Sequence, residues 1–148
     1  LKMTFAETLR LYPPVWAIFQ KIRNDEILGG YCLRADGKVV LSPYAMHRHP
    51  QLWPDPERFD PLRFTEAAES ARPRHAYMPF GGGRHVCIGR RFAAMEAHLA
   101  IAQIAQCFSM RVAAGARIKA DPLLTLRLKN GLPVELETRA QAARVLGA

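Results

Sequence analysis

The sequence predicts a mainly helical protein with a small amount of β-structure, an α+β fold class. Three observations predict it: helical apolar spacing near the start and over residues 88–108, short β-branched runs elsewhere, and a proline-rich middle. With 148 residues and 49% hydrophobic content, the chain can bury a core. It starts at Leu1 inside a helical pattern, so we expect residues 1–148 to be a fragment of a larger protein.

A helix is predicted at the start of the chain. The stretch LKMTFAETLRLYPP has helical apolar spacing until Pro13 and Pro14, which cannot continue the hydrogen-bond ladder. Glu7 and Arg10 lie three residues apart and therefore share one helix face, where they can form an ion pair. Taken alone, such a pair is more often a solvated surface feature than a buried one.

Short strands and then an irregular segment are predicted next. The stretch GKVVLSPY follows a turn at Asp36–Gly37 and carries the β-branched residues of a strand. Five prolines between residues 43 and 61 leave room only for short regular elements. Because Trp53, Phe59 and Phe64 lie in or beside this stretch, we expect an ordered coil with buried aromatic anchors.

A long helix is predicted over residues 88–108, after a glycine-rich segment. Alanine dominates this stretch and favours a helix, and the large apolar residues recur near one stripe. The residues of this stripe are Phe92, Met95, Leu99, Ile104 and Phe108.

The end of the chain predicts a β-hairpin around Asn130 and Gly131. Apolar and polar residues alternate on both sides of this pair in LLTLRLKNGLPVELE. A three-residue loop at 129–131, with Gly131 left-handed, keeps apolar residues opposite one another, whereas a two-residue loop does not. The expected pairs are Leu128 with Leu132, Leu126 with Val134, and Leu124 with Leu136.

The most informative stretch is FGGGRHVCIG, residues 80–89. It lacks the Gly-Lys-Ser/Thr ending of a phosphate loop, and Val86 stands where a dinucleotide loop has its last glycine. A phosphatase-type loop would need an arginine six residues after the cysteine, where the chain has alanine. A cysteine nucleophile with His85 or His75 as its base and a zinc site around Cys87 remain open, although the spacing suits neither well.

A single thiolate ligand to an iron porphyrin explains the glycines better. The sulfur must be held against the metal while backbone N–H groups donate to it. Glycines allow the main chain to approach closely and to adopt positive φ angles. A helix beginning near residue 88 would also point its positive N-terminal end at the sulfur and so stabilise the thiolate.

These residues resemble the haem-binding signature of the cytochrome P450 family, Phe-x-x-Gly-x-(Arg or His)-x-Cys-x-Gly. Two further family motifs occur in the family's order, Glu-x-x-Arg followed by a proline pair, and Pro-x-Arg-Phe. The resemblance covers nearly the whole chain and implies the C-terminal, haem-ligating part of the cytochrome P450 fold. The matching residues are Phe80, Gly83, His85, Cys87 and Gly89; Glu7, Arg10, Pro13 and Pro14; and Pro56, Arg58 and Phe59.

The resemblance implies a cofactor site of haem b, iron protoporphyrin IX. Cys87 would be the axial thiolate ligand of the iron, and Phe80 would pack beside the ligand loop and shield it. Gly83 and Gly89 would shape the loop. His85 occupies the place at which the family uses Arg or His towards a haem propionate.

The resemblance also implies a structural triad of charges. Glu7, Arg10 and Arg58 would form a buried group that fixes the irregular segment, the family's meander, against the first helix. Removing one member of such a group is costly because it leaves an uncompensated buried charge.

The activity that the resemblance implies is that of a haem-thiolate monooxygenase. It would insert one oxygen atom from O2 into a small organic or lipid-like substrate. Electrons would come from NAD(P)H through a ferredoxin, a flavodoxin or a flavoprotein reductase. The family's oxygen-activating helix would precede Leu1, so this stretch alone is expected to be inactive. A peroxide-using thiolate-haem hydroxylase and a non-catalytic haem-binding or sensing module are the alternatives.

The chain is basic, with 21 Lys and Arg against 13 Asp and Glu. A basic cluster brackets the cysteine loop, and it suits either an acidic electron donor or a solvated surface. We expect no nucleic-acid partner, because interleaved aromatics and known modules are missing. We also expect no membrane segment in this part and a cytoplasmic, bacterial protein. The cluster comprises Arg72, Arg74, Arg84, Arg90 and Arg91.

Overall fold

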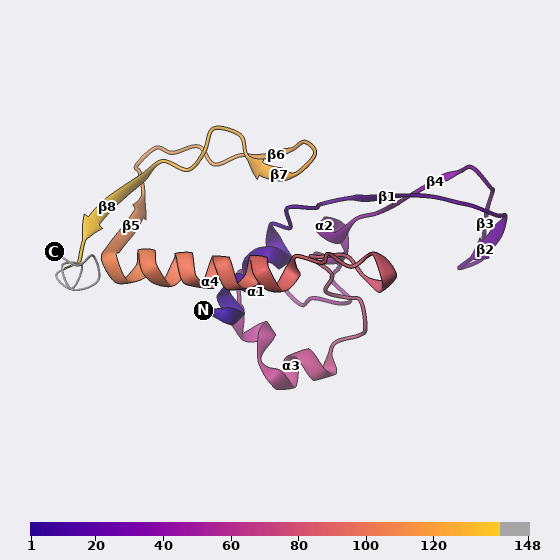
Figure 1. The fold of residues 1–148 in the computed structure, drawn as a ribbon, viewed down its shortest axis with the longest axis horizontal. Helices are drawn as coiled ribbons and strands as arrows, with labels where there is room; N and C mark the ends of the chain where they lie inside the picture. The colour runs from indigo at the N-terminus through magenta and orange to yellow at the C-terminus, as the bar shows by residue number, and fades with distance from the viewer. Residues whose placement is uncertain (140–148) are drawn as a thin grey trace.

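The computed structural model describes residues 1–139. Its helices lie near the centre, and one arm of paired strands extends away from them (Figure 1). A second arm starts at the far end of the long C-terminal helix and turns back over it, where Trp16 donates to the Leu123 carbonyl. The helices and 3-10 turns are α1 (Lys2–Leu11), α2 (Pro43–Met46), η1 (Pro61–Phe64), α3 (Glu66–Ala71), η2 (Gly83–His85) and α4 (Arg90–Cys107). The strands are β1 (Ile18–Lys21), β2 (Glu26–Leu28), β3 (Tyr31–Leu33), β4 (Lys38–Leu41), β5 (Phe108–Val112), β6 (Ala120–Pro122), β7 (Leu126–Leu128) and β8 (Val134–Thr138).

Helix α1 confirms the first prediction. It ends at Leu11, and Tyr12 leaves the helical region with φ −128° and ψ 63°, as the residue before two prolines must. Its second half is buried, and this face carries two charged residues, Glu7 and Arg10, among leucines. The solvated alternative for this pair is therefore wrong.

The first arm holds the predicted strand. Strand β4 pairs antiparallel with β1, from Ile18 opposite Leu41 to Lys21 opposite Lys38, and β2 pairs with β3 farther out. Asp36 has φ 65°, which permits the tight turn before β4. Figure 1 shows these strands as one long arm.

The proline-rich middle is ordered by short capped elements. The Ser42 hydroxyl accepts from the Ala45 amide at the start of α2, and the Asp60 carboxylate accepts from the Leu62 amide at the start of η1. Trp53, 2% exposed, is buried as predicted. Its ring contacts Phe64 with centroids 6.0 Å apart. Phe59 was expected in this core, but its side chain is 48% exposed.

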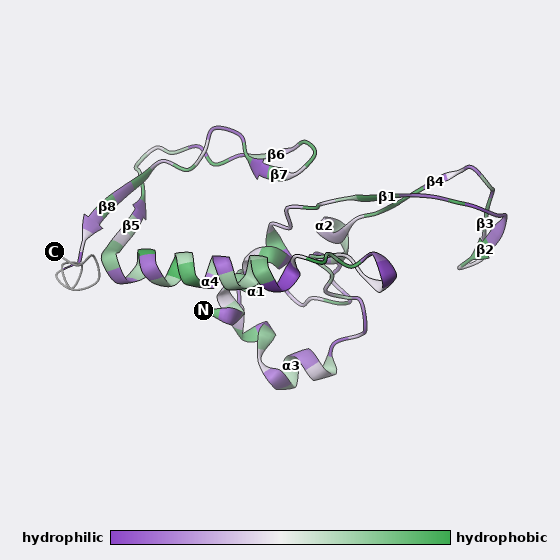
Figure 2. Ribbon diagram, viewed as in Figure 1, coloured by the Kyte–Doolittle hydropathy of each residue, from purple (hydrophilic) through white to green (hydrophobic). Residues whose placement is uncertain are grey.

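Helix α4 begins at Arg90, two residues later than predicted, because the cysteine loop extends to Gly89. It packs against α1, where Phe5 and His98 meet edge to face with ring centroids 5.3 Å apart. Among the residues that the structure describes, Cys107 is the one buried residue of this helix. Figure 2 shows hydrophobic residues along α4, and the predicted stripe is largely solvent-facing in this chain.

The predicted C-terminal hairpin is wrong in its pairing. Strand β8 pairs with β5, so that Val134 lies opposite Val112 and Leu136 opposite Met110. Strand β7 pairs with β6, so that Leu126 lies opposite Pro122 and Leu128 opposite Ala120. Alternating residues show which side chains share a face but do not identify the partner strand. Strand β5 offers five consecutive positions to β8, which a hairpin closed at 129–131 would leave unpaired. Gly131 is left-handed, with φ 73°, as predicted.

The aromatic core makes a stability prediction. Trp53→Ala removes a fully enclosed ring and should lower the free energy of unfolding by about 3–5 kcal/mol. Trp16→Ala is the matched control, because Trp16 is only half-buried and its Nε1 donates to the Leu123 carbonyl. Urea denaturation followed by circular dichroism measures both. Equal losses for the two variants would show that Trp53 is not the centre of the core.

Candidate functional site

The loop at residues 80–89 closes on itself around Cys87. The Cys87 amide donates to the Phe80 carbonyl over 2.9 Å, and the Val86 amide donates to the Gly83 carbonyl. Gly81 and Gly83 have φ angles of 75° and 64°, a conformation that side-chain-bearing residues rarely adopt. The glycines therefore serve backbone geometry, and the Cys87 thiol is left exposed.

Helix α4 starts directly after this loop. Gly89 is its N-cap and makes no side-chain cap, and a Cβ built on Gly89 would lie 3.8 Å from the Cys87 sulfur. The first amides of a helix have no partners within the helix and carry partial positive charge. The sulfur thus lies beside a helix end that favours an anion, and a thiolate is the form of cysteine that binds metals.

A cavity of about 310 Å³ borders the glycines of the loop. Strands β1 and β4 contribute Ile18, Gln20 and Leu41 to its wall, and the loop segment contributes His75 and His85. The wall is mostly apolar with two imidazoles at its side. It can accept part of a flat apolar group that carries anionic substituents.

A buried ion pair lies behind the loop. The Arg10 Nε and Nη2 atoms donate to the two oxygens of Glu7 over 2.7 and 2.9 Å. Both side chains are 0% exposed. Arg10 also donates to the carbonyls of His47, Pro56 and Arg58, and the Glu7 carboxylate accepts from the Asp60 amide. These bonds tie the irregular segment to α1.

The third charge of this group is not the one predicted. Arg58 is exposed and contributes only its backbone carbonyl to Arg10. Arg63 instead places its Nε 3.6 Å from the Glu7 carboxylate, and its side chain is 12% exposed. The sequence contains a second copy of the Pro-x-Arg-Phe pattern that includes this residue. It spans residues 61–64, five residues after the first copy at residues 56–59. The pattern fits both copies, and only packing selects Arg63.

His47 is a buried site residue that the sequence did not predict. It makes two hydrogen bonds through its ring, to Arg10 and Met78, and it stacks near Tyr77 with centroids 5.3 Å apart. Burial, and to a smaller extent the neighbouring guanidinium groups, lower the pKa of His47 to about 4, against an opposing contribution from its hydrogen bond to the Arg10 backbone. Burial also raises the pKa of Tyr77, so its hydroxyl, which donates to the Ala6 carbonyl, is neutral at physiological pH. No motif marks His47, since the exposed His49 two residues later looks equivalent in the sequence.

The basic cluster is only partly a surface feature. Arg74, Arg84, Arg90 and Arg91 are exposed around the cysteine loop. Arg72 instead stacks over Trp53 and Phe64, with its guanidinium carbon 4.5 and 4.6 Å from the ring centroids. Burial lowers the pKa of this guanidinium. Arg72 therefore belongs to the aromatic core, and four arginines remain on the surface.

The family follows from comparison with known proteins. The cytochrome P450 family model matches residues 1–133. The chain belongs to the cytochrome P450 family. Cytochrome P450 132 of Mycobacterium tuberculosis is 42% identical over 128 residues, which cover 86% of this chain and 28% of the relative. Cyclooctatin synthase of Streptomyces melanosporofaciens is 41% identical over 122 residues, or 82% of this chain and 27% of the relative.

Solved structures agree with the fold. The retinoic acid-bound cyanobacterial CYP120A1 has a TM-score of 0.88 and 33% identity over 93% of this chain and 32% of its own. The cytochrome P450DA heme domain has a TM-score of 0.88 and 32% identity over 95% of this chain and 31% of its own. The chain thus spans under a third of the length of these relatives. The α+β cytochrome P450 fold class is confirmed.

The residues of this cytochrome P450 chain fit a haem. The exposed Cys87 thiol, a mostly apolar cavity bordering the same loop and the open space at Gly83 are features that suit a porphyrin with a single sulfur ligand. Within residues 1–139, no three His, Cys, Asp or Glu side chains gather as a metal site would require. A zinc site is therefore not supported there. No helix in the described part of the chain is long and apolar enough to cross a membrane.

Arg63 and Arg58 provide a matched pair of variants. Arg63→Ala should lower the free energy of unfolding by about 1–3 kcal/mol, because the buried Glu7 loses one of its counter-charges. Arg58→Ala should stay within about 0.5 kcal/mol of the parent, because the exposed side chain is lost but the carbonyl bound by Arg10 remains. Chemical denaturation measures both. A larger loss of unfolding free energy for Arg58→Ala than for Arg63→Ala would identify Arg58 as the third charge.

Proposed function

We propose that this chain forms the thiolate-haem part of a monooxygenase that inserts one oxygen atom from O2 into an organic substrate. Cys87 would be the axial ligand of haem b iron. One observation carries the proposal. The exposed Cys87 sulfur stands between a loop closed by the Cys87–Phe80 hydrogen bond and the start of α4. No other cysteine in the described residues has such surroundings, since Cys32 lies in β3 and Cys107 is buried.

Bound haem supplies the activation of dioxygen, and electron donation from its thiolate ligand favours cleavage of the O–O bond. The protein's own part is to hold the sulfur in place and keep it ionised. Phe80 fixes the Cys87 amide through its carbonyl, Gly83 supplies the left-handed turn of the loop, and Gly89 caps α4 beside the sulfur. His85, beside the cavity, would bind an anionic propionate. Glu7 and Arg10 keep the segment beneath the loop in place.

The electrons would come from NAD(P)H through an acidic ferredoxin, a flavodoxin or a flavoprotein reductase. Four exposed arginines around the loop support this assignment, because complementary charge accelerates docking. The substrate would be small and organic or lipid-like. A structural neighbour that holds retinoic acid, an apolar carboxylic acid, supports this class. Relatives from Mycobacterium and Streptomyces support a bacterial enzyme, and its location would be the cytoplasm.

Substitution of the sulfur tests the ligand. Cys87→Ser in the haem-loaded protein should abolish the strongly red-shifted Soret band that thiolate ligation gives to the reduced carbon monoxide complex. Cys32→Ser is the matched control and should leave the band unchanged, because this exposed thiol lies on the arm formed by β2 and β3. A band that survives Cys87→Ser would assign the ligand to another residue and refute the proposal.

Charge reversal tests the donor surface. Arg91→Glu should slow reduction by an acidic ferredoxin at low salt by about 2–10-fold, and added salt should narrow the difference. Arg117→Glu, an exposed residue between β5 and β6, makes the same change of net charge and should have a smaller effect. Stopped-flow reduction at two ionic strengths measures both. Equal decreases of the reduction rate in the two variants would mean that docking depends on the net charge of the protein and not on the arginines around the cysteine loop.

A further inference from the structure

His47 joins three parts of the chain through its backbone and its ring. It follows the last residue of α2, and its side chain is fully buried. The ring Nδ1 lies 3.1 Å from the carbonyl oxygen of Arg10 in α1. The Met78 amide lies 2.9 Å from the ring Nε2, and the His47 carbonyl accepts from the Arg10 guanidinium.

These two partners allow only one form of the imidazole. A carbonyl oxygen can only accept, so Nδ1 must carry the hydrogen that is donated to Arg10. A backbone amide can only donate, so Nε2 must present its lone pair to Met78. The neutral Nδ1–H tautomer satisfies both groups. The doubly protonated ring would set an N–H against the N–H of Met78.

Met78 connects this ring to the cysteine loop. Its carbonyl accepts from the Gly81 amide over 3.1 Å, two residues before η2 begins. Phe80, between them, accepts the hydrogen bond of the Cys87 amide. The Met78 amide therefore connects the segment just before the loop to the buried core around Arg10. Movement of Met78 would displace the carbonyl that fixes Cys87.

We propose that His47 is a positioning residue for the haem ligand: its neutral ring clamps the Met78 amide to the α1 backbone, and protonation of that ring releases the cysteine loop. This inference rests on the proposed function, because it assigns the Cys87 sulfur to haem. It makes the loop acid-sensitive through a residue that touches neither the sulfur nor the cavity.

The surrounding charges set the sign of the pH effect. Arg10 from α1, Arg48 beside the ring and Arg72 after α3 all oppose a second positive charge. Tyr77 is neutral, and Glu7 is already bound to Arg10. Burial is the largest cause, and together with the three guanidinium groups it lowers the pKa of His47 from 6.5 to about 4, although the hydrogen bond to the Arg10 backbone opposes this shift. A lowered pKa means that the clamped state is fully favoured above pH 6.5 and loses its advantage as the pH falls towards 4. As the pH falls through this range, the ratio of molecules with the His47–Met78 hydrogen bond broken to molecules with it formed should rise by at most about 300-fold.

Three substitutions distinguish the role of the His47 Nδ1 atom from that of its Nε2 atom. His47→Gln places an amide oxygen near the position of Nε2, so it can accept from Met78, and it does not titrate. His47→Asn places an amide nitrogen near the position of Nδ1, so it can donate to Arg10 but is too short to reach Met78. His49→Gln is the matched control, because it makes the same substitution two residues away at an exposed position.

Two measurements on the haem-loaded protein decide the matter, hydrogen exchange of the Met78 amide and the fraction of thiolate-ligated carbon monoxide complex. At pH 7, His47→Asn should exchange Met78 at least about 10-fold faster than the parent and lower the thiolate fraction. His49→Gln should match the parent in both, whereas His47→Gln should lie between the parent and His47→Asn, because it accepts from Met78 but no longer donates to the Arg10 carbonyl. Between pH 7 and pH 4, the parent should lose protection and thiolate band relative to His47→Gln, whereas His49→Gln should follow the parent.

Several results would overturn the inference. One is the same pH dependence in the parent and in His47→Gln, a comparison that suffices if His47→Asn does not fold. Another is a Met78 amide in His47→Asn that stays as protected as in the parent. A third is an unchanged thiolate band in every His47 variant despite altered exchange. Absence of the band in the parent itself would instead contradict the proposed haem ligand.

Discussion

The structure depends on one buried ion pair, that of Glu7 and Arg10. Both side chains are 0% exposed, so each charge has lost its water and must be compensated within the protein. The compensation comes from each other and from the backbone of a segment with little regular structure of its own. This requirement places residues 47–60 against α1. A chain region that cannot form long helices or strands is thereby given one conformation.

The same polar core extends towards the cysteine loop. Arg10 binds His47 through its guanidinium and through its carbonyl, and His47 holds the amide of Met78. The loop then uses its own hydrogen bond between Cys87 and Phe80, with left-handed glycines at 81 and 83. Polar bonds with fixed donors and acceptors connect α1 to the loop. Apolar packing alone would restrain the backbone less specifically.

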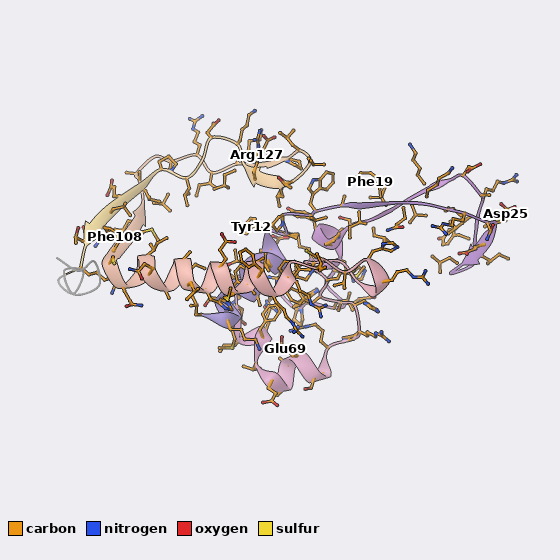
Figure 3. The ribbon with its side chains drawn as sticks, viewed as in Figure 1. Tyr12, Phe19, Asp25, Glu69, Phe108 and Arg127 are labelled. Atoms are coloured by element: carbon orange, nitrogen blue, oxygen red, sulfur yellow. The ribbon has the colours of Figure 1, made fainter. Side chains whose placement is uncertain are left out.

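Arginine has several different uses in this small region. Arg10 is buried and donates hydrogen bonds to a carboxylate and three carbonyls, whereas Arg63 supplies a second positive charge near Glu7. Arg72 lies over the aromatic rings of the core, and its guanidinium also donates to the Arg63 carbonyl. The exposed arginines around Cys87 remain available for a partner. Figure 3 shows side chains crowded near Tyr12 at the centre, while Asp25 and Arg127 lie on the two arms.

The sequence by itself determined the local features: where α1 ends, the long α4, the strand at β4 and the cysteine loop. Each depends on neighbours within a few residues, such as the prolines after Tyr12 or the glycines before Cys87. Only the tertiary structure decided which segments meet. It chose Arg63 over Arg58, paired β8 with β5, and buried His47 while leaving His49 exposed. These choices depend on burial and on hydrogen bonds between residues far apart in the chain, and such energies leave no periodic pattern in the sequence.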